Sequence, residues 1–118
     1  MDNLDILKKK INNKKLKISV LGLGYVGLPV AYNFAKKFEV AGFDINKKRV
    51  TELKKFKDKN NSLTEKQLRQ INIFFSSETK YLLGTDVYII TTPTPINNQK
   101  KPDLKFIFKA LDIVIKSD

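Results

Sequence analysis

The sequence predicts an α/β fold, a doubly wound parallel sheet of about four strands flanked by helices. Apolar segments typical of strands alternate with segments typical of helices along the chain, and this alternation indicates parallel pairing through right-handed crossovers. The strand segments are almost continuous apolar runs, as expected for a sheet covered on both faces. Because no internal repeat or Pro/Gly/Ser-rich linker interrupts the 118 residues, we expect a single domain over residues 1–118, with a lead-in segment over residues 1–16.

The first part of the chain carries the clearest element signals. Residues 5–15 predict a short polar helix, and residues 17–21 predict a buried strand because the run is short, β-branched and ended by glycine. Residues 25–37 predict a helix, with which Pro29 is compatible because first-turn amides have no acceptor within the helix. Apolar residues spaced by four predict one face of this helix: Val26, Val30, Phe34 and Phe38. A second strand is predicted over residues 39–44.

Capping residues indicate where the next two helices begin. Asn46 is the predicted cap of a helix that runs through Lys55. A short helix is then predicted over residues 64–70, because Ser62 and Glu65 have the spacing of a capping box.

Further strand and helix signals continue the alternation to the end of the chain. Strands are predicted over residues 71–75 and 87–92, with a brief helix over residues 78–83 between them. Four apolar residues predict one face of a last helix: Leu104, Ile107, Leu111 and Val114.

The composition excludes several kinds of chemistry. The chain has no cysteine and no histidine, so it offers no disulfide, thiol nucleophile or imidazole base. No apolar run is long enough to cross a bilayer, and the N-terminus lacks the layout of a signal peptide. We therefore expect a cytoplasmic protein without a membrane partner.

The formal net charge of +11 raises the question of nucleic-acid binding. Arginine occurs only as Arg49 and Arg69, whereas the recognition of bases and phosphates relies on arginine. The lysines are scattered and form no interleaved platform with aromatic residues. This pattern favours solvated faces and predicts no specific nucleic-acid partner.

A glycine-rich turn follows the first predicted strand: Gly22-Leu23-Gly24-Tyr25-Val26-Gly27. It lies directly after a strand and opens a helix, which is the context that the GxGxxG dinucleotide motif requires. In that motif the first glycine permits a tight turn, the second lets the backbone approach a pyrophosphate, and the third lets the helix pack closely on the strand. The free amides and the positive end of the helix then face the anion.

Asp44 ends the second predicted strand about 20 residues beyond this turn, where the fold places the acid that binds the ribose hydroxyls. A carboxylate there repels a 2′-phosphate, so the sequence favours NAD over NADP. Arg49 is a complication, because an arginine nearby can accommodate that phosphate. Strand, turn, helix and acid together predict a Rossmann-like dinucleotide-binding domain with NAD as its cofactor.

The fourth predicted strand ends in an unusual turn, Thr91-Thr92-Pro93-Thr94-Pro95. Taken with Gly24-Tyr25-Val26-Gly27-Leu28-Pro29 and the stretch Phe43-Asp44-Ile45-Asn46 leading to Arg49, this turn resembles the UDP-glucose/GDP-mannose dehydrogenase family. The resemblance runs from near Lys17 to the end of the chain. It is greatest to the branch that makes UDP-N-acetylhexosaminuronic acids for bacterial capsule, O-antigen and Vi-type polysaccharides.

The resemblance implies an NAD-dependent enzyme that oxidises the C6 alcohol of a UDP-sugar to the uronic acid in two steps, each reducing one NAD. Ligands of such folds bind beyond the carboxyl ends of the strands. The cofactor contacts that it implies are Tyr25 and Val26 at the pyrophosphate, Asp44 and Arg49 at the adenosine ribose, and Thr94, with Thr92 and Pro93, beside the nicotinamide half.

The chain departs from the family pattern in one loop and in its length. Phe56 occupies the place of a glycine, and Asn60 and Ser62 replace a threonine and a glutamate, although Asp58 persists. The conformation of this loop is therefore left open. The family's cysteine nucleophile, its supporting lysine and asparagine, and the sugar-nucleotide domain lie far downstream and have no counterpart in these 118 residues. We expect the chain alone to be inactive toward UDP-sugars.

Two other classes of protein share the phosphate turn. One is a free-standing dinucleotide-sensing regulatory module of the kind that gates potassium transport, and the other is a dehydrogenase acting on hydroxy acids. The rigid turn Pro93-Thr94-Pro95 argues against the sensor, which has no evident need for it, and the hydroxy-acid enzymes do not share it. Because residues 87–92 would leave an unpaired strand edge, we also expect a homo-oligomer.

Overall fold

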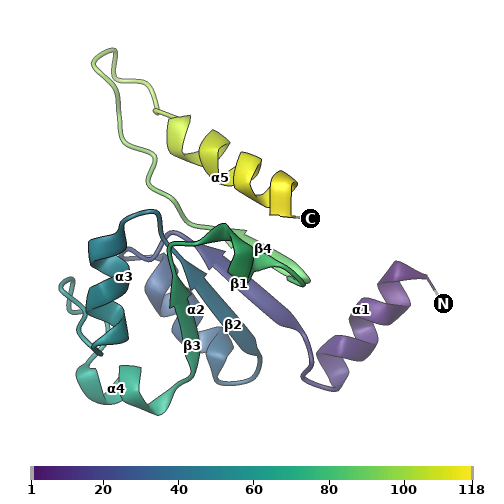
Figure 1. The fold of residues 1–118 in the computed structure, drawn as a ribbon. Helices are drawn as coiled ribbons and strands as arrows, with labels where there is room; N and C mark the ends of the chain where they lie inside the picture. The colour runs from purple at the N-terminus through teal and green to yellow at the C-terminus, as the bar shows by residue number, and fades with distance from the viewer. Residues whose placement is uncertain (1, 118) are drawn as a thin grey trace.

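Four parallel strands form one sheet in the computed structural model, which describes residues 2–117 (Figure 1). They are β1 (Lys17–Leu21), β2 (Glu39–Phe43), β3 (Ile73–Ser76) and β4 (Val87–Ile90). Their order across the sheet is β3-β2-β1-β4, so the chain starts at a central strand and builds outward on both sides. The predicted doubly wound α/β fold is confirmed.

Helices cover both faces of this sheet, and each face has its own hydrophobic core. The helical elements are α1 (Asn3–Asn12), α2 (Gly27–Ala35), α3 (Lys47–Lys54), α4 (Glu65–Gln70), the 3-10 helix η1 (Thr79–Leu82) and α5 (Lys105–Ser117). Apolar residues of α2, α3 and α4 pack with Ile18, Val20 and Val40 on one face. On the other face, η1 and α5 pack over Leu21 and Phe43.

The helix α1 stands away from the sheet and has no buried residue (Figure 1). It begins at Asn3 because the Asp2 carboxylate caps it by accepting the Asp5 amide at 2.8 Å. The prediction of a lead-in helix is confirmed, two residues earlier than expected. No helix within residues 2–117 is long and apolar enough to cross a membrane.

The strand register brings three chain segments together at the carboxyl edge of the sheet. Leu21 lies opposite Phe43 on one side and opposite Ile90 on the other. The ladder continues just beyond the strands: the Gly22 amide donates to the Phe43 carbonyl at 2.8 Å, and the Thr91 amide donates to the Leu21 carbonyl at 2.8 Å. The glycine turn, the end of β2 and the end of β4 are therefore neighbours.

The buried face predicted for the second helix is half wrong. Of the four predicted residues, Val30 and Phe38 pack against the core, whereas Val26 is 63% exposed and Phe34 is also exposed. The fully buried residues of the helix are Gly27, Leu28 and Ala31. The cause is the glycine turn, which makes Val26 the N-cap and starts the helix at Gly27. The close approach of Gly27 to the strand then sets which face is buried.

The predicted capping box is also wrong in its residues. Thr64 caps α4: its hydroxyl accepts the Gln67 amide at 3.1 Å, and the Gln67 side chain accepts the Thr64 amide at 2.8 Å. Ser62 does not serve as the cap because its amide is held by Asp58 Oδ2 at 2.7 Å, in the preceding loop. The predicted cap of α3 is confirmed, since Asn46 Oδ1 accepts the amides of Lys48 and Arg49.

The later elements lie where the sequence places them, with shifted bounds. β3 begins at Ile73 because Ile71 caps the end of α4. The brief helix predicted over residues 78–83 is the 3-10 helix η1. The predicted face of the last helix is half wrong: Leu104 and Leu111 are exposed, and the side chains that reach the core are Ala110, Ile113 and Val114.

Candidate functional site

The glycine turn between β1 and α2 forms one wall of the site, and the fold itself demands two of its glycines. Gly22 has a φ of 99°, and a Cβ there would lie 2.9 Å from the Thr91 carbonyl carbon. A Cβ on Gly27 would overlap the Gly22 carbonyl oxygen and Thr91 Oγ1. Any side chain at Gly22 or Gly27 would therefore push the turn away from β4.

Gly24 is different, because a Cβ there would meet no protein atom within 4 Å. Its backbone borders open space at the mouth of a cavity. The next residue, Tyr25, is 72% exposed, and no side chain caps the N-terminus of α2. Unfilled space over a glycine and an uncapped helix start are features that a bound anion can complete.

Asp44 follows β2, and the backbone fixes its carboxylate in place. Oδ2 accepts the Leu23 amide of the glycine turn at 2.9 Å, and Oδ1 accepts the Asn46 amide at 2.9 Å. A carboxylate has about four acceptor positions in all, so each oxygen keeps capacity for another donor. Asp44 can therefore receive two hydroxyl groups while it holds the turn.

Arg49 projects from α3 into the wall of the same cavity, and its side chain is already engaged. Only 9% of the residue is exposed. Nε donates to the Leu23 carbonyl at 2.8 Å, and Nη1 forms a 2.9 Å ion pair with Asp58 Oδ1 that is not aligned as a hydrogen bond. Nη2 is buried without a partner. Reaching out to a 2′-phosphate would break both contacts.

The turn after β4 forms the opposite wall. Thr91 Oγ1 donates to the Gly22 carbonyl at 2.7 Å, which joins this turn to the glycine turn. Thr92 Oγ1 is buried and has no hydrogen-bond partner among residues 2–117. Pro93 and Thr94 follow, both exposed at the cavity. A buried hydroxyl without a partner is costly, so its position favours a ligand that pairs with it.

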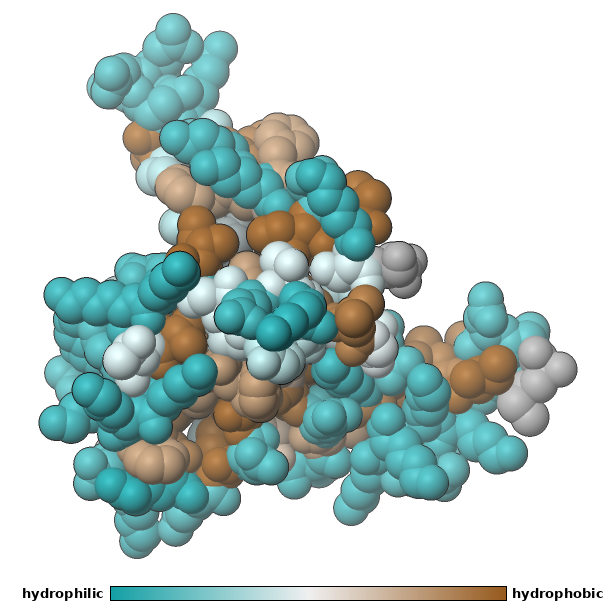
Figure 2. Space-filling view, in the orientation of Figure 1, coloured by the Kyte–Doolittle hydropathy of each residue, from teal (hydrophilic) through white to brown (hydrophobic). Residues whose placement is uncertain are grey.

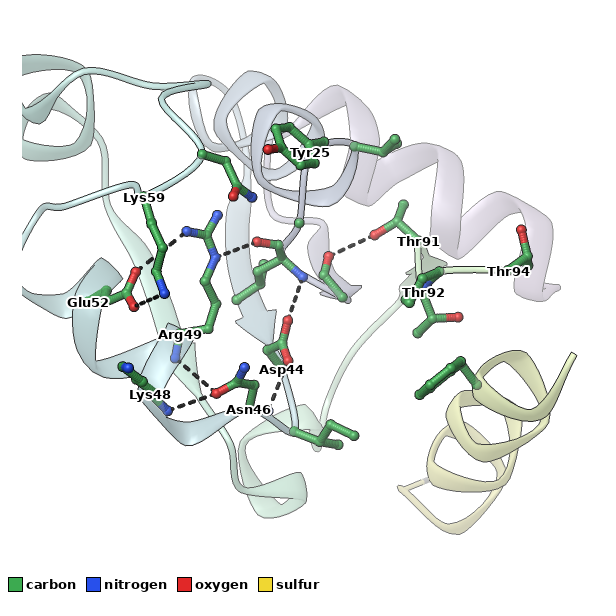
Figure 3. Close-up of a pocket in the computed structure, with 18 residues that line it drawn as sticks. Tyr25, Asp44, Asn46, Lys48, Arg49, Glu52, Lys59, Thr91, Thr92 and Thr94 are labelled. Atoms are coloured by element: carbon green, nitrogen blue, oxygen red, sulfur yellow. Dashed lines mark hydrogen bonds and ion pairs between the residues drawn. The ribbon is translucent and has the colours of Figure 1, made fainter. Parts of the chain in front are cut away.

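These walls enclose a cavity of about 760 Å³ at the carboxyl edge of the sheet (Figure 3). In the close-up, Arg49 lies on the left beside Glu52 and Lys59, Tyr25 lies above Asp44 in the centre, and Thr91, Thr92 and Thr94 lie on the right. All but one of the sequence-predicted site residues line the cavity: Gly22, Gly24, Tyr25, Val26, Asp44, Arg49, Thr92, Pro93 and Thr94. Gly27 packs behind them.

The cavity also includes residues that sequence reasoning missed. Lys48 and Glu52 are on α3, Lys59 and Asn60 come from the loop after α3, and Phe106 comes from α5. The loop was marked in the sequence by its departures from a family pattern, but nothing in it indicated a place at the cavity. Phe106 had no sequence signal, because it reaches the site only through the packing of α5.

A glycine turn, a strand-end carboxylate and a buried orphan hydroxyl around one cavity match the needs of a dinucleotide. An uncapped helix start suits the anion of a dinucleotide, and an acid at the end of β2 suits its ribose. The cavity volume lies within the usual range for cofactor sites. Fold and site together define a dinucleotide-binding domain.

The chain belongs to the UDP-glucose/GDP-mannose dehydrogenase family, whose NAD-binding domain matches residues 16–117. It is 48% identical over 101 residues to the UDP-N-acetyl-D-glucosamine 6-dehydrogenase of Salmonella typhi, a match that covers 85% of this chain and 24% of that protein. It is also 48% identical over 99 residues to the protein CapL of Staphylococcus aureus, covering 84% of this chain and 23% of that protein. The chain thus spans about a quarter of the length of these relatives.

A solved structure agrees with this assignment. The UDP-D-ManNAc dehydrogenase of Pyrococcus horikoshii superposes with a TM-score of 0.81 at 28% identity, covering 87% of this chain and 26% of that chain. The family resemblance and the cofactor NAD, both predicted from the sequence, are confirmed. The alternative of a dinucleotide-sensing regulatory module receives no support from these relatives.

Proposed function

We propose that the chain is the NAD-binding portion of a nucleotide-sugar 6-dehydrogenase. Such an enzyme oxidises the C6 alcohol of a UDP-sugar to the uronic acid for the synthesis of a surface polysaccharide. The observation that carries this proposal is the meeting of the glycine turn, Asp44 and the turn from Thr92 to Thr94 around one cavity in a chain of this family. The names of the relatives from Salmonella typhi and Staphylococcus aureus support the substrate class.

Each wall of the cavity is assigned to one part of NAD. The amides at the start of α2, with Tyr25 and Val26, take the pyrophosphate. Asp44 and Arg49 flank the adenosine ribose, and Asp44 disfavours a 2′-phosphate. Pro93 and Thr94 lie beside the nicotinamide half, where Thr92 offers its unpaired hydroxyl. The walls of the cavity therefore suit NAD better than NADP.

We also propose that the chain by itself oxidises no UDP-sugar. It contains no cysteine or histidine, so the covalent and proton-transfer roles of such an oxidation have no thiol or imidazole to fill them. NADH production, followed by absorbance after mixing the purified chain with NAD and a panel of UDP-sugars, checks this prediction. Turnover with any of them would contradict it.

Location and association are proposed on separate grounds. The lack of cysteine fits a cytoplasmic enzyme that needs no disulfide. A homo-oligomer is proposed because, within residues 2–117, β4 pairs only with β1 and leaves an open strand edge.

Titration calorimetry of the purified chain with NAD, NADP and ADP-ribose tests the proposed function. We expect NAD to bind, NADP to bind far more weakly, and ADP-ribose to bind nearly as well as NAD, because the adenosine and pyrophosphate contacts carry most of the affinity. A chain that binds none of the three would overturn the proposal.

A further inference from the structure

Asp58 lies just outside the cavity, in the loop after α3, and its side chain is 0% exposed. Oδ1 accepts the Asn60 amide at 3.0 Å, while Oδ2 accepts the amides of Ser62 and Leu63 at 2.7 and 2.9 Å. Burial alone would raise the pKa of this carboxyl, but the backbone amides and the Arg49 guanidinium outweigh it and lower the pKa. Asp58 is therefore a buried, ionised carboxylate.

This carboxylate is joined to the cofactor site by a short series of contacts. Asp58 Oδ1 lies 2.9 Å from Arg49 Nη1, and Arg49 Nε donates to the Leu23 carbonyl at 2.8 Å. The Leu23 amide in turn donates to Asp44 Oδ2 at 2.9 Å. A displacement of Asp58 would move the guanidinium and, through it, the peptide that holds Asp44.

The remaining nitrogen of Arg49 is free for a ligand. Nη2 is buried, has no hydrogen-bond partner in the described part of the chain, and belongs to a residue that lines the cavity. A guanidinium only donates hydrogen bonds, in a rigid planar fork. Once Leu23 and Asp58 fix the other two nitrogens, the direction of Nη2 is fixed as well.

We propose that Asp58 is a positioning residue of the cofactor site, which sets the affinity for NAD through Arg49 without touching the cofactor. It directs Nη2 toward an acceptor atom on the bound dinucleotide and steadies the Leu23 peptide behind Asp44. The proposal rests on the proposed binding of NAD in this cavity. A purely structural Asp58 would fold its own loop and leave NAD affinity unchanged in every folded variant.

The first test compares two carboxylates by calorimetric titration of the full chain with NAD. Asp58→Asn is expected to weaken NAD binding roughly tenfold, as removal of a supporting partner does at other preorganised sites. Asp86→Asn is the control, because Asp86 also pairs with a lysine (Lys10 Nζ at 2.6 Å) and accepts a backbone amide (Lys17 at 2.9 Å). Asp86 directly precedes β4 and so lies at the amino ends of the strands, whereas the cavity lies at their carboxyl ends. The Asp86→Asn variant is therefore expected to bind NAD like the wild type.

The second test asks whether the effect passes through Arg49. Lysine keeps the charge but lacks the fork, so the same Asp58→Asn change is made in an Arg49→Lys background. If Asp58 acts through the guanidinium, the double variant and the Arg49→Lys variant differ in NAD affinity by less than about twofold. Equal losses in both backgrounds would show that Asp58 acts otherwise, and would overturn the proposal.

Hydrogen exchange on the wild-type chain decides the matter if Asp58→Asn does not fold. NAD is expected to slow exchange at the amides of Asn60, Ser62 and Leu63 more than at the Lys17 amide, which reports general stabilisation. Equal slowing overturns the proposal. A wild-type chain that binds no NAD overturns the proposed function together with it, whereas an Asp58→Asn variant that binds NAD like the wild type overturns this proposal alone.

Discussion

Among single residues, Gly24 is the one whose small size the protein itself does not require. Gly22 lies so close to the backbone after β4, and Gly27 so close to the Gly22 carbonyl and Thr91, that no side chain fits. Gly24 has open space where a Cβ would lie and no positive φ. The need for glycine there arises only when a ligand approaches the backbone. Folding and binding can thus be separated within one turn.

Alanine substitutions measure this separation. Gly24→Ala should leave the free energy of unfolding within about 1 kcal/mol of wild type, because the methyl group meets no protein atom. It should nevertheless weaken NAD binding at least tenfold, about 1.4 kcal/mol, by keeping the pyrophosphate from the backbone. Gly27→Ala should destabilise the fold itself. Urea unfolding and NAD titration provide the two measurements, and a Gly24→Ala variant that binds NAD like the wild type contradicts the assignment.

Asp44 is expected to discriminate between NAD and NADP by its charge. Hydrogen bonds from the ribose hydroxyls to a charged acceptor contribute about 1.5–3 kcal/mol each before ordering costs. Asp44→Ala should therefore weaken NAD on the order of tenfold or more. It should also narrow the gap to NADP, because the repulsion is removed and Lys48 and Lys59 line the same cavity.

Calorimetry with both dinucleotides checks this result. Asp112→Ala is a suitable control, since Asp112 lies on α5 and pairs there with Lys116 at 2.9 Å. If Asp44→Ala and wild type bind NAD equally, the role of Asp44 is wrong, and with it the main physical argument for NAD over NADP.

At the scale of elements, the end of α3 shows how the loop reaches the cavity. Phe56 has a φ of 62°, a left-handed conformation that favours glycine at this position after a helix. Its amide donates to the Leu53 carbonyl and the Lys57 amide donates to the Glu52 carbonyl, both at 3.0 Å, which is the Schellman pattern. The ring also lies 4.4 Å from the Arg69 guanidinium. Strain in the backbone is thus offset by packing of the side chain.

Two substitutions separate the strain from the packing. Phe56→Ala removes the ring and keeps the strain, whereas Phe56→Gly removes both. We expect both variants to have a lower free energy of unfolding than the wild type. The value for the glycine variant should be about 1 kcal/mol higher than the value for the alanine variant. Urea unfolding measures the difference. In a helix interior the order of glycine and alanine would be reversed, so an alanine variant that is the more stable contradicts the interpretation.

The strands and the three site motifs could be predicted from sequence because their signals are local. The run before Gly22 is apolar and β-branched, and Asp44 lies at a fixed distance from the turn. The buried face of α2 could be predicted only in part, because the packing of Gly27 on the strand also buries Leu28 and Ala31. The place of Lys59 and Asn60 at the cavity could not be predicted, since the positive φ of Phe56 and the buried Asp58 carry them there. Such contacts leave no periodic trace in the sequence.

At the scale of the whole molecule, the edge strand β4 is less buried than the central strand β1. Each residue of β4 is only half-buried, whereas β1 is buried along most of its length. The helix α5 beside it exposes apolar residues in a row, and Figure 2 shows hydrophobic side chains at the surface along this helix. The row consists of Leu104, directly before α5, and of Phe108, Leu111 and Ile115 on the helix. An open strand edge and an apolar row on the same side invite another copy of the chain.

The last prediction is that the chain self-associates through β4 and α5, and that salt favours the association. The net charge of +11 opposes contact between copies, and raising the salt concentration from about 0.05 M to about 0.5 M screens this repulsion. Phe108 and Ile115 are 63% and 72% exposed, so burying them supplies apolar area. The double change Phe108→Lys and Ile115→Lys should weaken association at least tenfold.

Sedimentation velocity across a concentration series measures the effect, and Phe74→Lys is the control. Phe74 is 50% exposed but lies on β3, at the other edge of the sheet, where its ring packs on Tyr81. The Phe74→Lys change should leave the association unchanged, because the β3 edge takes no part in the proposed contact. A wild-type chain that stays monomeric at high concentration in high salt would sink the prediction, and so would a Phe74→Lys variant that dissociates as much as the α5 variant.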